Sequence, residues 1–383
     1  MSKNNTDRRH FLKRSIQGLG ITLAAGQLPV YAQPGPNTSS QPGEKTENLQ
    51  VLYETDLFHP HGDPDDHFDL ATVYLLAKQG YFDLLEIMLD YPPPHRSGDP
   101  GIIPVAQMNR LCGLGVPTCI GSSVLLKKRN DTLPELDHCD CQSVDTMIST
   151  LRKAKGNVAI VCVGSSSDIV LAANREPELF REKCAGVWLN AGSGTEEPDK
   201  QEYNTRLNPQ AYAGMFDLPC PLYWFPCWHY IEKRQSSEWG SFYWLPHEKA
   251  FRGISDPLRM YFEYMFKKSG EMKYLRFLEG RPDEAFWSEI NTQNRGMWST
   301  ASLFLMAQLT VTKQGEIVPL VEIEKKDELF RMEPITAQCG DDGRVQWQLT
   351  DQSTNRFLFH VLDAAIYPDA MARAINSLFR TLS

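Results

Sequence analysis

Short apolar runs alternate along this chain with segments of helical periodicity. The clearest run, residues 158–163, is continuous and rich in β-branched residues, which is typical of a buried strand in a parallel sheet. Residues 51–53 form another run that ends abruptly in acidic residues, and a helical pattern follows Pro64 with Phe68, Ala71, Leu75 and Leu76 on one face. Further strands are predicted at residues 82–90, 116–120, 186–189 and 222–225, and further helices at 102–112, 144–155 and 169–173.

This order of strands and helices predicts an α/β fold, a Rossmann-like open and mostly parallel sheet with helices on both faces. The last third of the chain adds amphipathic helices at 257–268 and 367–382. Residues 333–338 and 345–349 are expected to be strands at the sheet edge, joined by a turn at 340–343.

The first 48 residues do not follow the α/β pattern. Arg8-Arg9-His10-Phe11-Leu12-Lys13 and the weakly apolar segment after it resemble a twin-arginine export signal, and Ala32 is a plausible end of that signal. Residues 33–48 are rich in Pro, Gly and polar residues, which predicts a disordered linker. We therefore expect a signal peptide at 1–32, a linker at 33–48 and one domain at 49–383, in a protein that is periplasmic or secreted.

Charge and apolar content limit the partners. The first 32 residues carry five Lys or Arg and one Asp, so their removal takes the net charge from −9 to −13. An acidic chain argues against nucleic acid and anionic membrane surfaces, and no later stretch reaches the ~18 apolar residues of a membrane span. A small neutral ligand is compatible with this charge. The oligomeric state stays open, with a homo-oligomer among the states allowed. The nine Cys are scattered and specify no disulfide.

Candidate chemistry lies where the first strand meets its helix. Asp56 ends the strand, and Asp65 and Asp66 begin the helix, so all three should gather at the carboxyl edge of the sheet, where open α/β sheets bind ligands. Converging carboxylates repel one another unless a cation holds them, and oxygen ligands suit calcium or magnesium. The alternative is an acidic helix N-terminus whose side chains are simply solvated.

Four blocks of the sequence resemble the inosine-uridine-preferring nucleoside hydrolase family, in matching order and spacing over roughly residues 50 to 383. Thr55-Asp56 with Asp65-Asp66 resembles its opening Asp-Thr-Asp-Pro-Gly-x-Asp-Asp motif. The later blocks are Val161-Cys-Val-Gly164-Ser-Ser-Ser-Asp168, residues 187–192, and Glu202-Tyr203-Asn204 followed by Asn208-Pro209-Gln-Ala211.

The resemblance implies a nucleoside hydrolase fold and a role for each matched residue. Asp56 would be the metal-bound general base, while Asp66 and the carbonyl of Val163 would be further ligands of a Ca²⁺ cofactor. Asp65, Glu202 and Asn204 would hold the sugar. Without the resemblance, Glu202 and Asn204 would be interpreted as loop residues that hydrogen-bond to their own backbone.

The chain also departs from the family pattern. The loop before Asp65 is five residues longer, and its His59, His61 and Asp63 either add ligands or are solvated. Glu54 replaces the first Asp of the motif, and no Asn is recognisable after the second strand. The late His-Asp pair that supplies a calcium ligand is replaced by Trp298-Ser299-Thr300. Either a hydroxyl coordinates there, another acid substitutes, or the metal is lost.

Two insertions are aromatic, Cys227-Trp228-His229-Tyr230 and Trp239-Gly-Ser-Phe-Tyr-Trp244. They either wall a pocket or belong to the core, and His247 near them is a candidate acid for the leaving group. Three functions are therefore open: a metal-dependent hydrolase of N-glycosidic bonds in ribosides, a non-catalytic nucleoside- or sugar-binding protein of the same fold, and a hydrolase of another glycoside.

Overall fold

The computed structural model describes residues 48–90, 99–195, 202–229 and 235–382. Residues Glu47–Ser383 form one compact unit. The predicted signal peptide at 1–32, and the predicted linker at 33–48 except for its last residue, lie outside the described residues.

The main sheet and three small two-stranded sheets account for the strands. The main sheet contains β1 (Gln50–Thr55), β3 (Asp83–Leu89), β5 (Thr118–Ile120), β6 (Val158–Cys162), β7 (Cys184–Asn190), β8 (Leu222–Phe225), β13 (Phe330–Cys339), β14 (Val345–Leu349) and β15 (Arg356–Val361). The small sheets pair β2 (Phe58–His59) with β4 (Asp99–Pro100), β9 (Tyr243–Pro246) with β10 (Asn294–Met297), and β11 (Leu309–Val311) with β12 (Ile317–Pro319).

Helices separate most of these strands, as the apolar pattern predicted. They are α1 (Asp65–Lys78), α2 (Ile102–Cys112), α3 (Gln142–Lys153), α4 (Ser167–Arg175), α5 (Pro177–Lys183), α6 (Tyr203–Leu207), α7 (Pro209–Met215), α8 (His247–Ala250), α9 (Asp256–Phe266), α10 (Tyr274–Phe277), α11 (Glu284–Ile290), α12 (Thr300–Met306), α13 (Tyr367–Phe379) and the 3₁₀ turn η1 (Leu320–Glu322).

The main sheet reverses its strand order at its centre. Its nine strands run in the order β14-β13-β15-β8-β7-β6-β1-β3-β5. The seven strands from β15 to β5 pair in parallel, while β13 and β14 form the antiparallel edge. The chain builds outward from β1 through β3 to β5, and then returns to β6 on the other side of β1. The predicted open, mostly parallel sheet is confirmed, with a topological switch point between β1 and β6.

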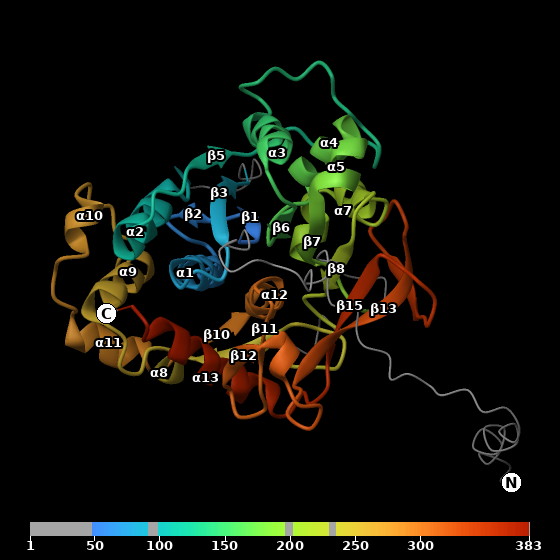
Figure 1. Cartoon of the computed structure of the whole chain (residues 1–383). Helices are drawn as coiled ribbons and strands as arrows, with labels where there is room; N and C mark the ends of the chain where they lie inside the picture. The colour runs from blue at the N-terminus through green and yellow to red at the C-terminus, as the bar shows by residue number, and fades with distance from the viewer. Residues whose placement is uncertain (1–47, 91–98, 196–201, 230–234, 383) are drawn as a thin grey trace, which may run out of the picture. The chain divides into compact units, whose positions relative to one another are not determined.

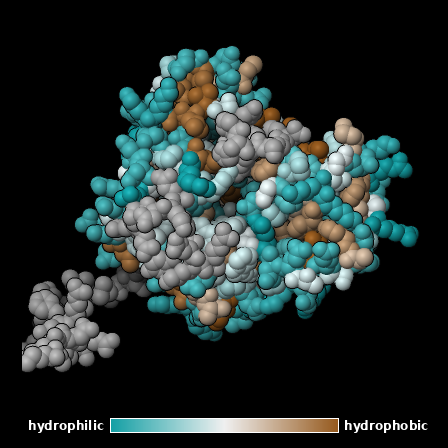
Figure 2. All heavy atoms as spheres, turned by 180° about the vertical axis from the view of Figure 1, so that it is seen from behind, coloured by the Kyte–Doolittle hydropathy of each residue, from teal (hydrophilic) through white to brown (hydrophobic). Residues whose placement is uncertain are grey.

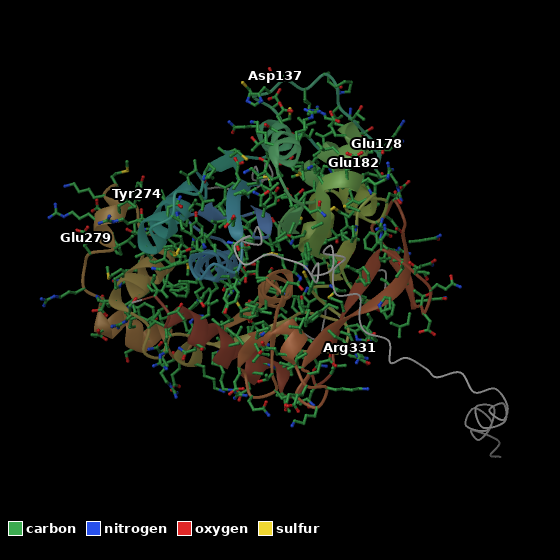
Figure 3. The ribbon with its side chains drawn as sticks, in the orientation of Figure 1. Asp137, Glu178, Glu182, Tyr274, Glu279 and Arg331 are labelled. Atoms are coloured by element: carbon green, nitrogen blue, oxygen red, sulfur yellow. The ribbon has the colours of Figure 1, made fainter. Side chains whose placement is uncertain are left out.

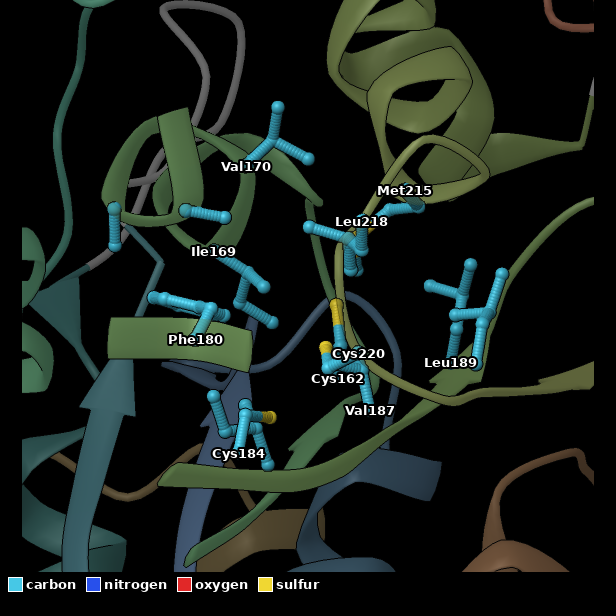
Figure 4. Packing of buried hydrophobic residues seen from close by; sticks show 14 of the residues in the cluster. Cys162, Ile169, Val170, Phe180, Cys184, Val187, Leu189, Met215, Leu218 and Cys220 are labelled. Atoms are coloured by element: carbon cyan, nitrogen blue, oxygen red, sulfur yellow. The ribbon is translucent and has the colours of Figure 1, made fainter. Parts of the chain in front are cut away.

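Helices cover both faces of the sheet, as predicted (Figure 1). On one face α3, α4, α5 and α7 pack against the strands. Part of this core is seen in Figure 4, where Ile169, Val170 and Phe180 lie over the strand residues Cys162, Cys184 and Val187. The other face carries α1 and α12. Twelve consecutive residues of α1, from Asp65 to Leu76, are buried, because α2, α12 and α13 also pack against this helix. One apolar face was predicted for it. The structure instead buries all sides of the helix up to Leu76, including the carboxylates of its first turn.

One face of the domain has a mostly polar exterior. The face seen in Figure 2 is mostly hydrophilic, with apolar residues gathered in separate patches, and Glu178, Glu182 and Glu279 lie at the periphery of the ribbon in Figure 3. None of the helices in the described part of the chain is long and apolar enough to cross a membrane.

Candidate functional site

The switch point brings the ends of β1 and β6 together. The amide of Val163, just past β6, donates a hydrogen bond to the carbonyl of Glu54 in β1 at 2.9 Å. Asp56 follows β1 directly, and Gly164 follows Val163. A Cβ added to Gly164 would lie 2.8 Å from the backbone nitrogen of Asp56, so the two strand ends are in close contact. Glycine is required here because no side chain fits between them.

A pocket of about 500 Å³ opens at this point, and all six residues predicted for the site line it. They are Asp56, Asp65, Asp66, Val163, Glu202 and Asn204. The pocket also receives polar residues from other segments: Asp63, Asn190, Tyr203, Arg206, Asn294, Arg295 and Ser299. The predicted gathering of the three aspartates at the carboxyl edge of the sheet is therefore present in the fold.

The acidic side of the pocket concentrates negative charge. Asp56, Asp65 and Asp66 are each less than 10% exposed. Burial, and after it the charges of Asp66, Asp69 and Asp56, raise the pKa of Asp65 well above its ordinary value. Arg295 offsets part of this repulsion, with its Nη2 3.1 Å from Asp65 Oδ1 and in contact with Asp63. Burial lowers the pKa of Arg295 to about 10, which leaves the guanidinium charged at neutral pH.

The donor set fits a hard cation. Asp56, Asp66 and Val163 line the same pocket. The two carboxylates, and the Val163 carbonyl that also accepts from Asn204, are oxygen donors of the kind that Ca²⁺ or Mg²⁺ prefers. Ser299 also lines the pocket and brings a hydroxyl to the region where the family motif has its late Asp. The neighbouring Thr300 is engaged elsewhere, because its Oγ1 donates to Asp69 Oδ1 at 3.1 Å. Of the two residues, only Ser299 lines the pocket, and its hydroxyl also bonds to Asp69.

Glu202 and Asn204 combine a local role with a place in the pocket. The Glu202 carboxylate accepts hydrogen bonds from the amides of Gly192, Asn204 and Thr205 at 2.9–3.1 Å, and so caps α6. Burial raises the pKa of Glu202, and these three amides oppose the rise. The Asn204 side chain donates to the carbonyls of Val163 (3.1 Å) and Asn190 (3.3 Å). Glu202 and Asn204 therefore hydrogen-bond to the backbone, as was expected without the family resemblance. They also line the pocket, as the resemblance to the nucleoside hydrolases implied.

Aromatic side chains form another part of the lining. Trp228, Phe242, Trp244 and Trp298 all face the pocket. Phe242 is stacked on Trp228 with ring centroids 4.4 Å apart and contacts Trp298 and Trp244 at 5.3 Å. Trp244 is 43% exposed, which is unusual for so large an apolar side chain. The pocket alternative is therefore correct for Trp228, Phe242 and Trp244 of the aromatic insertions, whereas Tyr243 of the same insertion is fully buried and does not line the pocket.

The enlarged loop places its histidines away from the lining. His59 and His61 are not among the pocket residues, whereas Gly62 and Asp63 are. His59 Nε2 lies 2.7 Å from the carbonyl of Ser269, and the His61 ring packs edge-on against His67 at 5.9 Å. Burial lowers the pKa of His61 to about 4. Of the three loop residues considered as ligands, only Asp63 reaches the pocket, and there it contacts Arg295.

His247 is not an acid of this site. It is buried against Phe68, Phe251 and Phe266, and its Nδ1 lies 3.1 Å from the carbonyl of Ile290. Burial lowers its pKa to about 4, so the ring is neutral at physiological pH. Its proximity in sequence to the aromatic insertion suggested a catalytic role, but β9 carries it into the aromatic core.

Sequence reasoning missed Arg295 and Asn190. Asn190 ends β7, donates to the carbonyl of Phe225 at 2.8 Å and has a buried Oδ1 without a partner among the described residues. Its place at the carboxyl end of a central parallel strand was an available signal. Arg295 had no local signal, because it reaches the acidic cluster only through the pairing of β10 with β9.

Behind the pocket lies a second group of acids. One oxygen from each of Glu54, Asp90 and Asp168 lies within 4.8 Å of the other two, and all three residues are buried. Burial first, and then mutual repulsion, raise the pKa of Glu54 well above its ordinary value and that of Asp90 to about 8. Burial raises the pKa of Asp168 to about 6. None of the three lines the pocket.

Comparison with known proteins yields structural neighbours, while no family model and no curated protein matches. The chain is similar to a purine-preferring ribonucleoside hydrolase from Gardnerella vaginalis, at 14% identity and a TM-score of 0.49, over 87% of this chain and 99% of the other. It is similar to an inosine-uridine preferring nucleoside hydrolase from Bacillus anthracis at 13% identity and a TM-score of 0.47, over 87% and 99%. A third neighbour is the type III effector protein XopQ complexed with adenosine diphosphate ribose, at 14% identity and a TM-score of 0.46, over 88% and 95%. The functional proposal rests on the geometry of the site.

Proposed function

We propose that this protein is an exported, metal-dependent hydrolase of the N-glycosidic bond in ribonucleosides or related ribosides. One observation carries the proposal. At the topological switch point, a single pocket of about 500 Å³ joins the carboxylates of Asp56, Asp65 and Asp66 to the carbonyl of Val163 and to Glu202 and Asn204. That volume suits a small molecule, and the residue types match those that glycosidic hydrolysis requires.

The reaction assigns a task to each group. Asp56 takes a proton from water as the water oxygen bonds to the anomeric carbon, and the carbon–nitrogen bond breaks with its electron pair leaving on the base. Asp65 and the neighbouring carboxylates face a sugar that becomes oxocarbenium-like, and their charge stabilises it. Glu202 and Asn204, fixed by their backbone hydrogen bonds, orient the sugar. Asp56, Asp66 and the Val163 carbonyl would hold a cation, which would supply Lewis acidity that lowers the pKa of water.

The aromatic lining suits the leaving base. Trp228, Phe242 and Trp298 present ring surfaces to the pocket, and each planar base–aromatic stack contributes about 1–3 kcal/mol. Among the described residues, none of those that line the pocket is a histidine. The described lining therefore offers Tyr203 and the guanidinium groups of Arg206 and Arg295 as hydrogen-bond donors to a departing base.

A non-catalytic binding protein is the second candidate, and one observation favours it. The late family carboxylate is a hydroxyl here, Ser299, and Arg295 already provides a positive charge 3.1 Å from Asp65. A pocket whose acids are compensated by Arg295 could bind a riboside without activating water.

The replacement Asp56→Asn separates the two candidates, because the amide is isosteric and keeps one oxygen. As a hydrolase, the protein should release sugar from at least one member of a nucleoside panel with added calcium, and Asp56→Asn should lower kcat by roughly 10²–10⁴-fold, the usual contribution of a general base. The matched control is Asp351→Asn, the same chemical change at an exposed position. A wild-type rate no higher than that of Asp56→Asn across the panel would defeat the hydrolase and favour the binding protein.

Export is part of the same proposal and rests on the Arg8-Arg9 motif alone. Replacement of both by Lys keeps the charge and removes the guanidinium groups. The variant precursor should accumulate in the cytoplasm, as fractionation and immunoblotting would show. Unchanged secretion would exclude the twin-arginine route without affecting the assignment of the pocket.

A further inference from the structure

The carboxylates of Glu54, Asp90 and Asp168, called the inner triad here, lie at the same end of the sheet but outside the pocket. Glu54 is the penultimate residue of β1, Asp90 follows β3, and Asp168 lies in the first turn of α4. Three segments far apart in the chain therefore converge, with one carboxylate oxygen of each within 4.8 Å of the others. Glu54 is fully buried, and the other two are less than 10% exposed.

Two members of the inner triad are held in place from outside it. Asp90 Oδ2 accepts a hydrogen bond from the amide of Ser165. Asp168 accepts from the amide of Ser122 at 3.2 Å and from the hydroxyl of Ser143. These donors fix the orientations of the two carboxylates in the way that outer-shell partners fix metal ligands. Each oxygen that accepts such a bond keeps a second lone pair that is available to a ligand.

Glu54 provides an independent indication of a ligand. Both of its carboxylate oxygens are buried and accept no hydrogen bond from a donor outside the triad among the described residues. One of them points into the group formed with Asp90 and Asp168, where the Glu54 carboxyl bonds only to the carboxyl of Asp90. A buried carboxylate without a cationic partner is costly. No Lys, Arg or His of the described residues forms an ion pair with any member of the triad, whereas Asp63 and Asp65 in the pocket share Arg295.

We propose that the inner triad binds one hard divalent cation, separate from the cation of the pocket. Three carboxylates offer six oxygens, which is the lower limit of calcium coordination. Two oxygen–calcium bonds of about 2.4 Å span at most about 4.8 Å, and the three ligand atoms lie within that limit. Thiolate and imidazole donors are absent from the triad, so zinc and copper are disfavoured.

The cation would position the catalytic edge without touching substrate. Gly164 separates the two sites: a Cβ on it would meet both Asp90 Oδ2 and the backbone of Asp56. A cation bound to the triad ties the ends of β1 and β3 and the start of α4 into one unit, and the bond from Ser165 to Asp90 joins the turn after β6 to it. Asp56 and Val163 are both carried by that unit. The proposal does not depend on the pocket being catalytic.

The test uses the purified full-length protein and counts bound calcium by elemental analysis after equilibration and desalting. Asp66→Asn disables the pocket cation and should leave one Ca²⁺ per chain. Adding Glu54→Gln to Asp66→Asn should weaken the remaining Ca²⁺ by more than about 100-fold, since loss of an outer-shell partner alone costs 10–100-fold. Magnesium is titrated in parallel, because a site closed to water should prefer calcium.

Thermal melting supplies the second readout and distinguishes a cation from a shared proton. If the triad holds a cation, calcium should raise the melting temperature of Asp66→Asn, and Glu54→Gln should abolish that rise. If the three acids merely share protons, Glu54→Gln imitates the protonated acid and should be as stable as the parent or more so. That result, or an Asp66→Asn protein that binds no calcium, overturns the proposal.

Two further comparisons complete the design. Asp168→Asn keeps an oxygen for Ser122 and Ser143, so it replaces Glu54→Gln if that variant does not fold, with the same expectation. The calcium measurements also test the inner site separately from the proposed hydrolase activity. A protein that hydrolyses no nucleoside but loses its last Ca²⁺ on Glu54→Gln retains the inner site and lacks only the reaction.

Discussion

Gly164→Ala should be the most informative small change in this protein. Gly164 lies at the junction of β1 and β6, where an added Cβ would lie 2.8 Å from the backbone nitrogen of Asp56 and 3.1 Å from its Cβ, and still closer to Asp90 Oδ2. Ordinary carbon contacts begin near 3.5 Å. The strand end cannot retreat, because Glu54 is held by Val163 on one side and Thr55 by Asp90 on the other, at 2.9 Å each.

Gly164→Ala should therefore lower both the free energy of unfolding and the catalytic rate. Overpacking a rigid interior by one methyl group destabilises by about 1–3 kcal/mol. A displacement of Asp56 by about 1 Å would lower kcat by about 100-fold. Gly115→Ala is the matched control, because a Cβ there meets nothing within 4 Å, and the free energy of unfolding should be unchanged or slightly higher.

Urea unfolding monitored by circular dichroism measures the first effect and the nucleosidase assay the second. If Gly164→Ala proves as stable and as active as Gly115→Ala, then the two strand ends are not in the close contact described. A loss of stability with unchanged activity would indicate that Asp90 moves instead of Asp56, and calcium counting on the variant would then show a weakened inner triad.

Two other changes have defined outcomes. Arg295→Gln removes the positive charge beside Asp65. Because the Arg295 side chain is partly exposed, the free energy of unfolding should fall by about 1–3 kcal/mol, between the values of exposed and buried ion pairs. Calcium should bind the variant more tightly, and an unchanged affinity in a calcium titration would contradict this. Asp69→Asn should flatten the pH dependence of stability in EDTA. Burial raises the pKa of Asp69 from 3.8 to about 7, and the bonds from Thr300 and Ser299 oppose the rise. The folded state therefore binds the extra proton, and wild-type stability falls as the pH rises from about 4 through 7, by at most about 4 kcal/mol at ~1.36 kcal/mol per pKa unit. Equal pH profiles of the two melting curves would refute the assignment.

The sequence predicted those parts of the fold that depend on local patterns. The alternation of apolar runs and helices gave the parallel sheet, and the acids that follow β1 gave the position of Asp56, Asp65 and Asp66. These two predictions succeeded because a buried parallel strand needs a continuous apolar run and because the carboxyl ends of parallel strands lie at the same edge of the sheet.

Contacts set by distant pairing were not accessible in the same way. The position of Arg295 depends on how β10 pairs with β9, which no local pattern encodes. The burial of α1 on all sides depends on helices from the end of the chain. The inner triad could be predicted only in part. Glu54 and Asp90 lie at the ends of neighbouring parallel strands, so they converge once the strand order is known. The strand order itself was not predicted.

Two different parts of the chain supply the acidic and the aromatic residues of the pocket. The carboxylates of Asp56, Asp65 and Asp66 and the residue Val163 come from the first half of the chain, at the ends of β1, β6 and α1. The aromatic surface comes from later segments, with Trp228 after β8, Phe242 before β9, Trp244 in β9 and Trp298 after β10. Mutation could therefore remodel the selectivity of this pocket through the later segments while the acidic centre stays constant. Across the relatives of this protein, divergence in substrate preference should concentrate between residues 227 and 299, and laboratory evolution of new preferences should start there.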